Sequence, residues 1–150
     1  MIIRTVLVTA AAVIGLSSAV AQSDKLPSTK LMSEQSQYLY RGLNLMVKGE
    51  TPYDQGKADE LFGKLIETAA KIPAAFPESS KGHAPPDARY SASPKVWENK
   101  ADFEAHAAKL AKTLHDNRSK AKTLDGLKAA YSEVNGACNS CHDTYRLRKG

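Results

Sequence analysis

Apolar residues recur at intervals of three and four along four stretches of the chain, which is the pattern of amphipathic helices. No stretch alternates apolar and polar residues in the way that predicts a strand. The first helix is expected over about Ser28–Lys48, between Pro27 and Gly49. The second is expected to begin at Asp54, a suitable N-cap, and to end before Pro73, which cannot continue a helix.

The third helix is expected after a long connection, residues 73–94, that is rich in Pro, Ser and Gly. Ser93 is its expected cap and Pro94 its first residue. The fourth helix is expected to run from about Thr123 through Tyr145. Four amphipathic helices joined mostly by short turns predict an all-α fold, an antiparallel four-helix bundle.

The N-terminal stretch differs from the rest of the chain. Arg4 precedes an apolar run from Val6 to Leu16, and Ala19-Val20-Ala21 fits the small-residue rule for signal cleavage. The apolar run is shorter than the roughly 20 residues that a membrane span needs. We therefore expect residues 1–21 to be a cleaved signal peptide and residues 22–150 to be one exported domain. This interpretation points to a bacterial periplasm and not to a membrane.

The charge pattern narrows the class of partner. The chain carries 21 Lys and Arg against 16 Asp and Glu, a formal net charge of +5. Both signs are mixed along the expected helices, and no dense basic stripe interleaves with aromatic residues. Such mixing is typical of solvated helix faces, and it argues against a nucleic-acid partner.

The two cysteines stand together in the stretch Cys138-Asn139-Ser140-Cys141-His142, which has three interpretations. A disulfide or redox pair suits an oxidising compartment, but redox C-x-x-C pairs belong to a strand–helix junction and not to a late helix. A zinc site needs four ligands with paired spacing. The other histidines, which lack that spacing, are His83, His106 and His115. The third interpretation is covalent haem attachment, which C-x-x-C-H signals.

Helical geometry gives a reason for the C-x-x-C-H spacing. Residues three and four apart on a helix share a face. Cys138, Cys141 and His142 therefore project from one side, where two thioethers and one imidazole meet a single porphyrin. The motif predicts one haem c per chain, bound covalently by Cys138 and Cys141, with His142 as an axial ligand of the iron.

The stretch CNSCHDTYR at 138–146, placed late in a helical chain, resembles the class II c-type cytochromes. Further support comes from KGETPYDQ at 48–55, FPESSKG at 76–82 and SASPKVWENKADF at 91–103. In particular, these stretches resemble cytochrome c-556, the low-spin branch related to cytochrome c′. The resemblance covers nearly the whole chain after the signal peptide. It implies a left-handed four-helix bundle with haem among the helices, and often a homodimer.

The resemblance also bears on the sixth ligand of the iron. The low-spin branch takes a methionine from the first helix, and Lys30-Leu31-Met32 matches that pattern. Counted back without a gap from Lys48-Gly49, however, the ligand position falls on Ser33. One extra residue turns a helix by about 100°. Met32 is therefore the expected ligand if a bulge or the helix end absorbs that residue; the alternative is that Met32 fills the core.

Arg146 stands four residues after His142, one turn on and on the same expected helix face. The resemblance places it beside the haem edge, where a guanidinium is suited to pair with a propionate or to shield His142 from anions. The alternative is a solvated cation at the helix end. A methionine-ligated haem predicts a one-electron carrier with transient redox partners, not an enzyme. An open sixth position would instead predict a five-coordinate binder of nitric oxide or carbon monoxide. Haem enzyme chemistry is disfavoured because the first helix offers no histidine near Met32.

Overall fold

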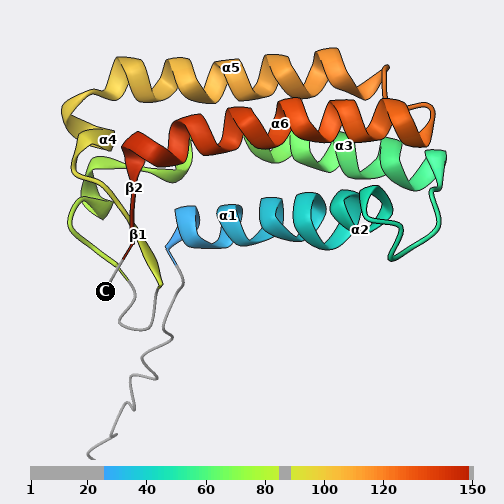
Figure 1. Ribbon diagram of the computed structural model, residues 1–150. Helices are drawn as coiled ribbons and strands as arrows, with labels where there is room; N and C mark the ends of the chain where they lie inside the picture. The colour runs from blue at the N-terminus through green and yellow to red at the C-terminus, as the bar shows by residue number, and fades with distance from the viewer. Residues whose placement is uncertain (1–25, 85–88, 149–150) are drawn as a thin grey trace, which may run out of the picture.

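The computed structural model of the chain describes residues 26–84 and 89–148. Four long helical segments lie side by side and alternate in direction (Figure 1). They are α1 with the π-helical turn η1 and α2 (Pro27–Tyr38, Leu39–Leu43 and Asn44–Val47), α3 (Gln55–Ala69), α5 (Lys100–Arg118) and α6 (Leu124–Tyr145). Packing joins α5 to α6 and α3, α1 to α3, and α2 to α6. The predicted antiparallel four-helix bundle is therefore confirmed.

Two of the predicted helix starts carry side-chain N-caps, of which the cap at Asp54 was expected. The Asp54 carboxylate accepts a hydrogen bond of 2.7 Å from the backbone N–H of Lys57, at the start of α3. The Thr123 hydroxyl accepts one of 3.1 Å from the backbone N–H of Gly126, at the start of α6. Each cap satisfies a backbone donor that the first helical turn leaves without a partner. Helix α3 ends at Ala69, a few residues before Pro73.

The third predicted helix is two helices. A short helix α4 (Lys95–Glu98) precedes α5, and Asn99 breaks them apart with a backbone φ of −120°. Pro94 is the N-cap of α4 and not its first residue, which corrects that part of the prediction, while the Ser93 hydroxyl accepts a hydrogen bond of 3.3 Å from the backbone N–H of Lys95, as expected of a capping residue. The long connection, which includes the 3-10 turns η2 (Pro73–Ala75) and η3 (Glu78–Ser80), folds against α4. The Trp97 indole N–H donates a hydrogen bond of 3.1 Å to the carbonyl of Pro77 and so holds the two together.

The prediction that the chain contains no strand was wrong. Strands β1 (Tyr90–Ala92) and β2 (Arg146–Arg148) pair antiparallel, with Tyr90 opposite Arg148. The backbone N–H of Ser93 also donates to the carbonyl of Tyr145, at 2.9 Å. Three-residue strands are too short to show an alternating pattern, so the sequence carries no local signal for them. The ribbon fastens the long connection to the end of α6 at one end of the bundle (Figure 1).

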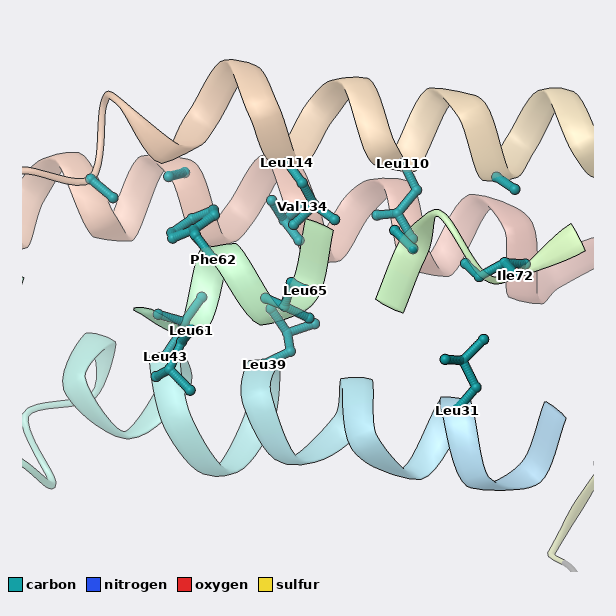
Figure 2. Close-up of a cluster of buried hydrophobic side chains, with 14 of the residues drawn as sticks. Leu31, Leu39, Leu43, Leu61, Phe62, Leu65, Ile72, Leu110, Leu114 and Val134 are labelled. Atoms are coloured by element: carbon teal, nitrogen blue, oxygen red, sulfur yellow. The ribbon is translucent and has the colours of Figure 1, made fainter. Parts of the chain in front are cut away.

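The core fills the space between the helices. The segment formed by α1, η1 and α2 is called helix one below. Figure 2 shows Leu39 and Leu43 pointing from helix one toward α3, while Leu31 points toward Ile72. The largest fully buried side chains are Phe62, Leu43, Leu114, Leu127, Val96, Val134 and Asn117. Within residues 26–84 and 89–148, none of the helices has the length and apolar character that a membrane crossing requires.

Candidate cofactor site

A cavity of about 420 Å³ is bounded by α1, α5 and α6 and by the β1–β2 ribbon. Its volume is within the usual range for small-molecule and cofactor sites. The apolar part of its wall includes Met32, Leu39, Phe76, Phe103, Leu110 and Val134. Arg89 and Arg146 are the only Lys, Arg, Asp or Glu residues that line it in the described part of the chain. A large apolar site with few polar groups at its edge suits a flat, mostly apolar ligand.

The C-x-x-C-H motif faces this cavity. Cys138, Cys141 and His142 all lie on α6, and all three line the cavity wall. Both cysteines are free and partly buried. Burial, with a smaller effect from the neighbouring Cys141, raises the pKa of the Cys138 thiol to about 11. Burial also raises the pKa of the Cys141 thiol. Both thiols are therefore protonated at neutral pH, unlike the low-pKa thiolates of dithiol redox sites.

The other histidines do not join the motif in a zinc site. His115 is exposed near the end of α5, while His83 and His106 line the cavity. Over residues 26–84 and 89–148, no group of three or more His, Cys, Asp or Glu side chains is arranged to hold a metal ion. The structure therefore offers no support for the zinc interpretation in the part of the chain it describes.

His142 has the protonation state that iron coordination requires. Burial, followed by the nearby charge of Arg146, lowers the pKa of its imidazole to about 4. The ring is neutral at pH 7, and the neutral imidazole is the form that binds metals. Its Nδ1 atom is buried and has no hydrogen-bond partner among residues 26–84 and 89–148. Since buried polar atoms are nearly always paired, this nitrogen fits a side chain that serves a bound group.

Met32 approaches the same cavity from α1. It is half-buried, packs against the hydrophobic core and lines the cavity wall. Ser33 also borders the cavity, but its side chain is exposed. One turn further along, Gln35 lines the cavity with a buried side-chain nitrogen that has no hydrogen-bond partner in the described part of the chain. The cavity thus brings together the two predicted axial residues, Met32 and His142, and adds an amide that sequence reasoning did not single out.

Arg146 is not on the helix face that the sequence predicted. It adopts an extended backbone as the first residue of β2, so the four-residue helical spacing to His142 does not apply. Its guanidinium lies over the ring of Tyr90, 4.5 Å from the ring centre, an arrangement typical of cation–π contacts. Arg146 still lines the cavity, together with Arg89 and Tyr90. Strand pairing places Tyr90 and Arg146 there, and Arg89 directly precedes β1, which explains why helical periodicity missed Arg89 and Tyr90.

A second polar cluster borders the cavity beside Cys141. The Tyr145 hydroxyl donates a hydrogen bond to the Asp102 carboxylate, and the His106 ring packs edge-on to the Tyr145 ring at 5.7 Å. The hydrogen bond to Asp102, followed by burial, raises the pKa of Tyr145 to about 12. Tyr145 therefore remains a neutral donor and fixes the end of α6 to α5. Neither Asp102 nor His106 carries a sequence signal for this role.

The residues of the cavity fit a covalently attached haem. Two protonated thiols and a neutral imidazole meet on one helix, the wall is apolar, and two arginines offer cationic partners for anionic groups at one edge. The Nδ1 atom of His142 adds a buried polar atom that none of the residues described by the structure satisfies.

Comparison with known proteins identifies the family. A family model described as Cytochrome C' matches residues 28–146. The chain belongs to the cytochrome c′ family. It is 40% identical to a cytochrome c-556 from Rhodopseudomonas palustris, over 99% of both chains. It is 34% identical to a cytochrome c′ from the same species, over 91% of both.

The fold of this cytochrome c′ family member agrees with solved structures. A model of oxidised cytochrome c556 from Rhodopseudomonas palustris superposes with a TM-score of 0.74 at 38% identity, covering 86% of this chain and 100% of that chain. Family membership and the fit of the cavity together confirm the predicted cofactor, haem c, attached covalently near the C-terminus. The relatives of this chain include proteins named cytochrome c-556 and proteins named cytochrome c′.

Proposed function

We propose that the chain is a periplasmic one-electron carrier whose haem c is bound by Cys138 and Cys141 and ligated by His142 and Met32. The observation that carries the proposal is that Met32 and His142, on different helices, line one apolar cavity. Met32 is anchored there by contact with the core. Methionine as the sixth ligand raises the reduction potential and leaves no open position for a substrate.

Each residue has a role that follows from its state in the folded chain. The protonated thiols of Cys138 and Cys141 supply the sulfurs of the two thioethers. Neutral His142 offers a nitrogen lone pair, and Arg146, with Arg89 nearby, offers a cation to a propionate. When bound, haem supplies reversible one-electron chemistry of its iron. The bundle surrounds it with apolar side chains, which lower the local dielectric constant and limit water access.

The rest of the proposal concerns location and partners. Residues 1–21 fit an export signal and residues 22–150 a single periplasmic domain; the predicted signal lies outside the described residues. Partners are transient redox proteins that dock by charge, as is usual for electron carriers. A homodimer, which the family resemblance implies, is part of the same proposal. The family consists of cytochromes, and no substrate is transformed in this account.

A five-coordinate binder of nitric oxide or carbon monoxide is the second candidate. The observation in its favour is Gln35, which lines the cavity and whose buried side-chain nitrogen has no hydrogen-bond partner among the described residues. A donor at this point would stabilise a small polar ligand on an open iron. The packed position of Met32 favours the carrier, since a methionine that fills this wall leaves little room for a gas.

Optical spectra of the purified protein in both oxidation states test the carrier. We expect six-coordinate low-spin spectra, with a methionine-to-iron charge-transfer band in the ferric state. Met32→Ala should lose that band and become high-spin, while the exposed control Ser33→Ala should keep it. A high-spin spectrum of the unaltered protein would reject Met32 as a ligand and favour the gas binder.

A further inference from the structure

The π-turn η1 inserts one residue into helix one. The backbone N–H of Asn44 donates to the carbonyl of Leu39, five residues back, whereas an α-helix uses a spacing of four. Both flanks, α1 and α2, are α-helical. Each residue turns an α-helix by about 100°. One inserted residue therefore offsets the side chains of α1 from those of α2 by about 100° relative to an uninterrupted helix.

Neighbouring helices hold the C-terminal half of helix one in a fixed direction. Leu43 is fully buried against α3. Gly42 lies so close to α3 that a Cβ atom there would come within 2.7 Å of the Leu61 side chain. On the other side, the Tyr40 hydroxyl donates a hydrogen bond of 2.9 Å to Oδ1 of Asn135 on α6. The turn is thus held between two helices, and any change of register must appear in α1.

The effect on α1 can be read from two buried leucines. Leu31 and Leu43 are 6% and 0% exposed, and both point into the core (Figure 2). In an uninterrupted α-helix, their separation in sequence would place them about 120° apart. The residue inserted by the π-turn reduces this angle to about 20°. The turn therefore allows α1 and α2 to bury leucines on one common face.

The same offset decides which residue of α1 faces the cofactor. With the π-turn, Met32 packs into the wall of the cavity and Ser33 is exposed. Without the turn, and with Leu43 fixed, α1 would rotate by about 100°, and Ser33 would take the direction of Met32. A serine hydroxyl there would replace the thioether sulfur.

We infer that the π-turn Leu39–Leu43 is a positioning element that directs residue 32, and not residue 33, toward the iron. The inference rests on the proposed carrier site and deepens it by naming what sets its sixth ligand. For this sequence, whether the surplus residue is held in the π-turn selects between Met32 and Ser33 as the residue that faces the iron. Gly42 does not line the cavity and acts through the turn, whereas Tyr40 holds the turn and also borders the cavity.

A histidine scan of haem-loaded protein tests the inference. The two matched variants are Met32→His and the double variant Met32→Ala/Ser33→His. We expect Met32→His to give a low-spin, bis-histidine signature by electron paramagnetic resonance and near-infrared magnetic circular dichroism. The double variant should be high-spin, like Met32→Ala. A bis-histidine signature from position 33 would overturn the inference.

Deletion of the exposed residue Arg41 provides the second arm. Removing one residue converts the turn to ordinary α-helix and leaves the direction of α1 unchanged. The deletion combined with Met32→His should therefore retain full helicity and the bis-histidine signature. Loss of that signature, or of the fold, would contradict the inference that the turn holds one surplus residue.

The spin state of the unaltered protein is a result independent of the histidine scan and of the Arg41 deletion. If the unaltered protein is high-spin, Met32 is not a ligand and the proposed function fails. The histidine scan would still report which position of α1 faces the iron, because the bis-histidine signature does not depend on the native sixth ligand.

Discussion

Tyr40 on the π-turn and Asn135 on α6 share a hydrogen bond of 2.9 Å, which joins the segment that carries Met32 to the helix that carries His142. Tyr40→Phe removes the donor and leaves the ring in place. We expect the free energy of unfolding of the haem-loaded protein to fall by about 1 kcal/mol, the usual net value of such a bond. Denaturant titration measures it.

Tyr53 provides a matched control for this variant. Its hydroxyl donates a hydrogen bond of 2.8 Å to the carbonyl of Ala121, and it does not line the cavity. Tyr53→Phe should cost a similar free energy and leave the haem spectrum unchanged. Tyr40→Phe should also introduce a high-spin fraction, because α1 is then less firmly oriented. Equal spectra for the two variants would refute a link between Tyr40 and the sixth ligand.

Haem attachment should be required for folding. The double variant Cys138→Ala/Cys141→Ala leaves the cavity of about 420 Å³ without its covalent ligand. Without haem, the apolar wall of this cavity loses its largest contact partner and is left open to water. Domains are only marginally stable, so a loss of apolar burial on this scale is a large fraction of their stability. We expect a largely disordered chain by circular dichroism; a cooperative melt from a fully helical state would contradict the expectation.

Replacing Arg146 should shift the reduction potential. Its guanidinium lines the cavity, and a cation near the haem favours the reduced state, which holds one more electron. Arg146→Gln should therefore lower the potential, by about 20 to 60 mV for a charge effect near 1 kcal/mol. Arg148→Gln is the control, because this exposed residue carries the same charge and does not line the cavity. Equal shifts in a redox titration would argue against a special role for Arg146.

The acid stability of the bundle should depend on Glu60. Hydrogen bonds from Lys64 and then Lys57 lower the pKa of its carboxyl from 4.5 to about 2. A lowered pKa adds stability that is complete above about pH 4.5 and is lost as the pH falls through about 2. Glu60→Gln should be less stable than the unaltered protein at pH 7, and the difference should disappear across that interval. Lys64→Gln should remove part of the stability that Glu60 contributes at pH 7. Denaturant titrations from pH 2 to 7 measure the free energy of unfolding of both variants.

Much of the architecture could be predicted because it depends on local pattern. The stripe that includes Leu61 and Leu65 shows its helical period directly, and Asp54 and Thr123 begin their helices with N-caps that only local geometry requires. The C-x-x-C-H motif is local as well, since its three functional residues lie within five positions of one helix.

The features that could not be predicted depend on contacts between distant segments. The π-turn is held by Leu61 beside Gly42 and by Asn135 beside Tyr40, and neither partner is near the turn in sequence. The count back from Lys48-Gly49 indicated only that helix one has one extra residue, held either in a bulge or at the helix end. The β1–β2 ribbon likewise forms only when the long connection reaches the end of α6, which is why Arg146 was assigned to a helix.

Exposure of the ferrous protein to carbon monoxide tests the central claim most directly. If Met32 and His142 both ligate the iron, the absorption spectrum of the unaltered protein should not change on addition of the gas. Met32→Ala should bind carbon monoxide readily and show the shifted spectrum of the complex. Prompt binding by the unaltered protein would contradict the carrier and show an open sixth position.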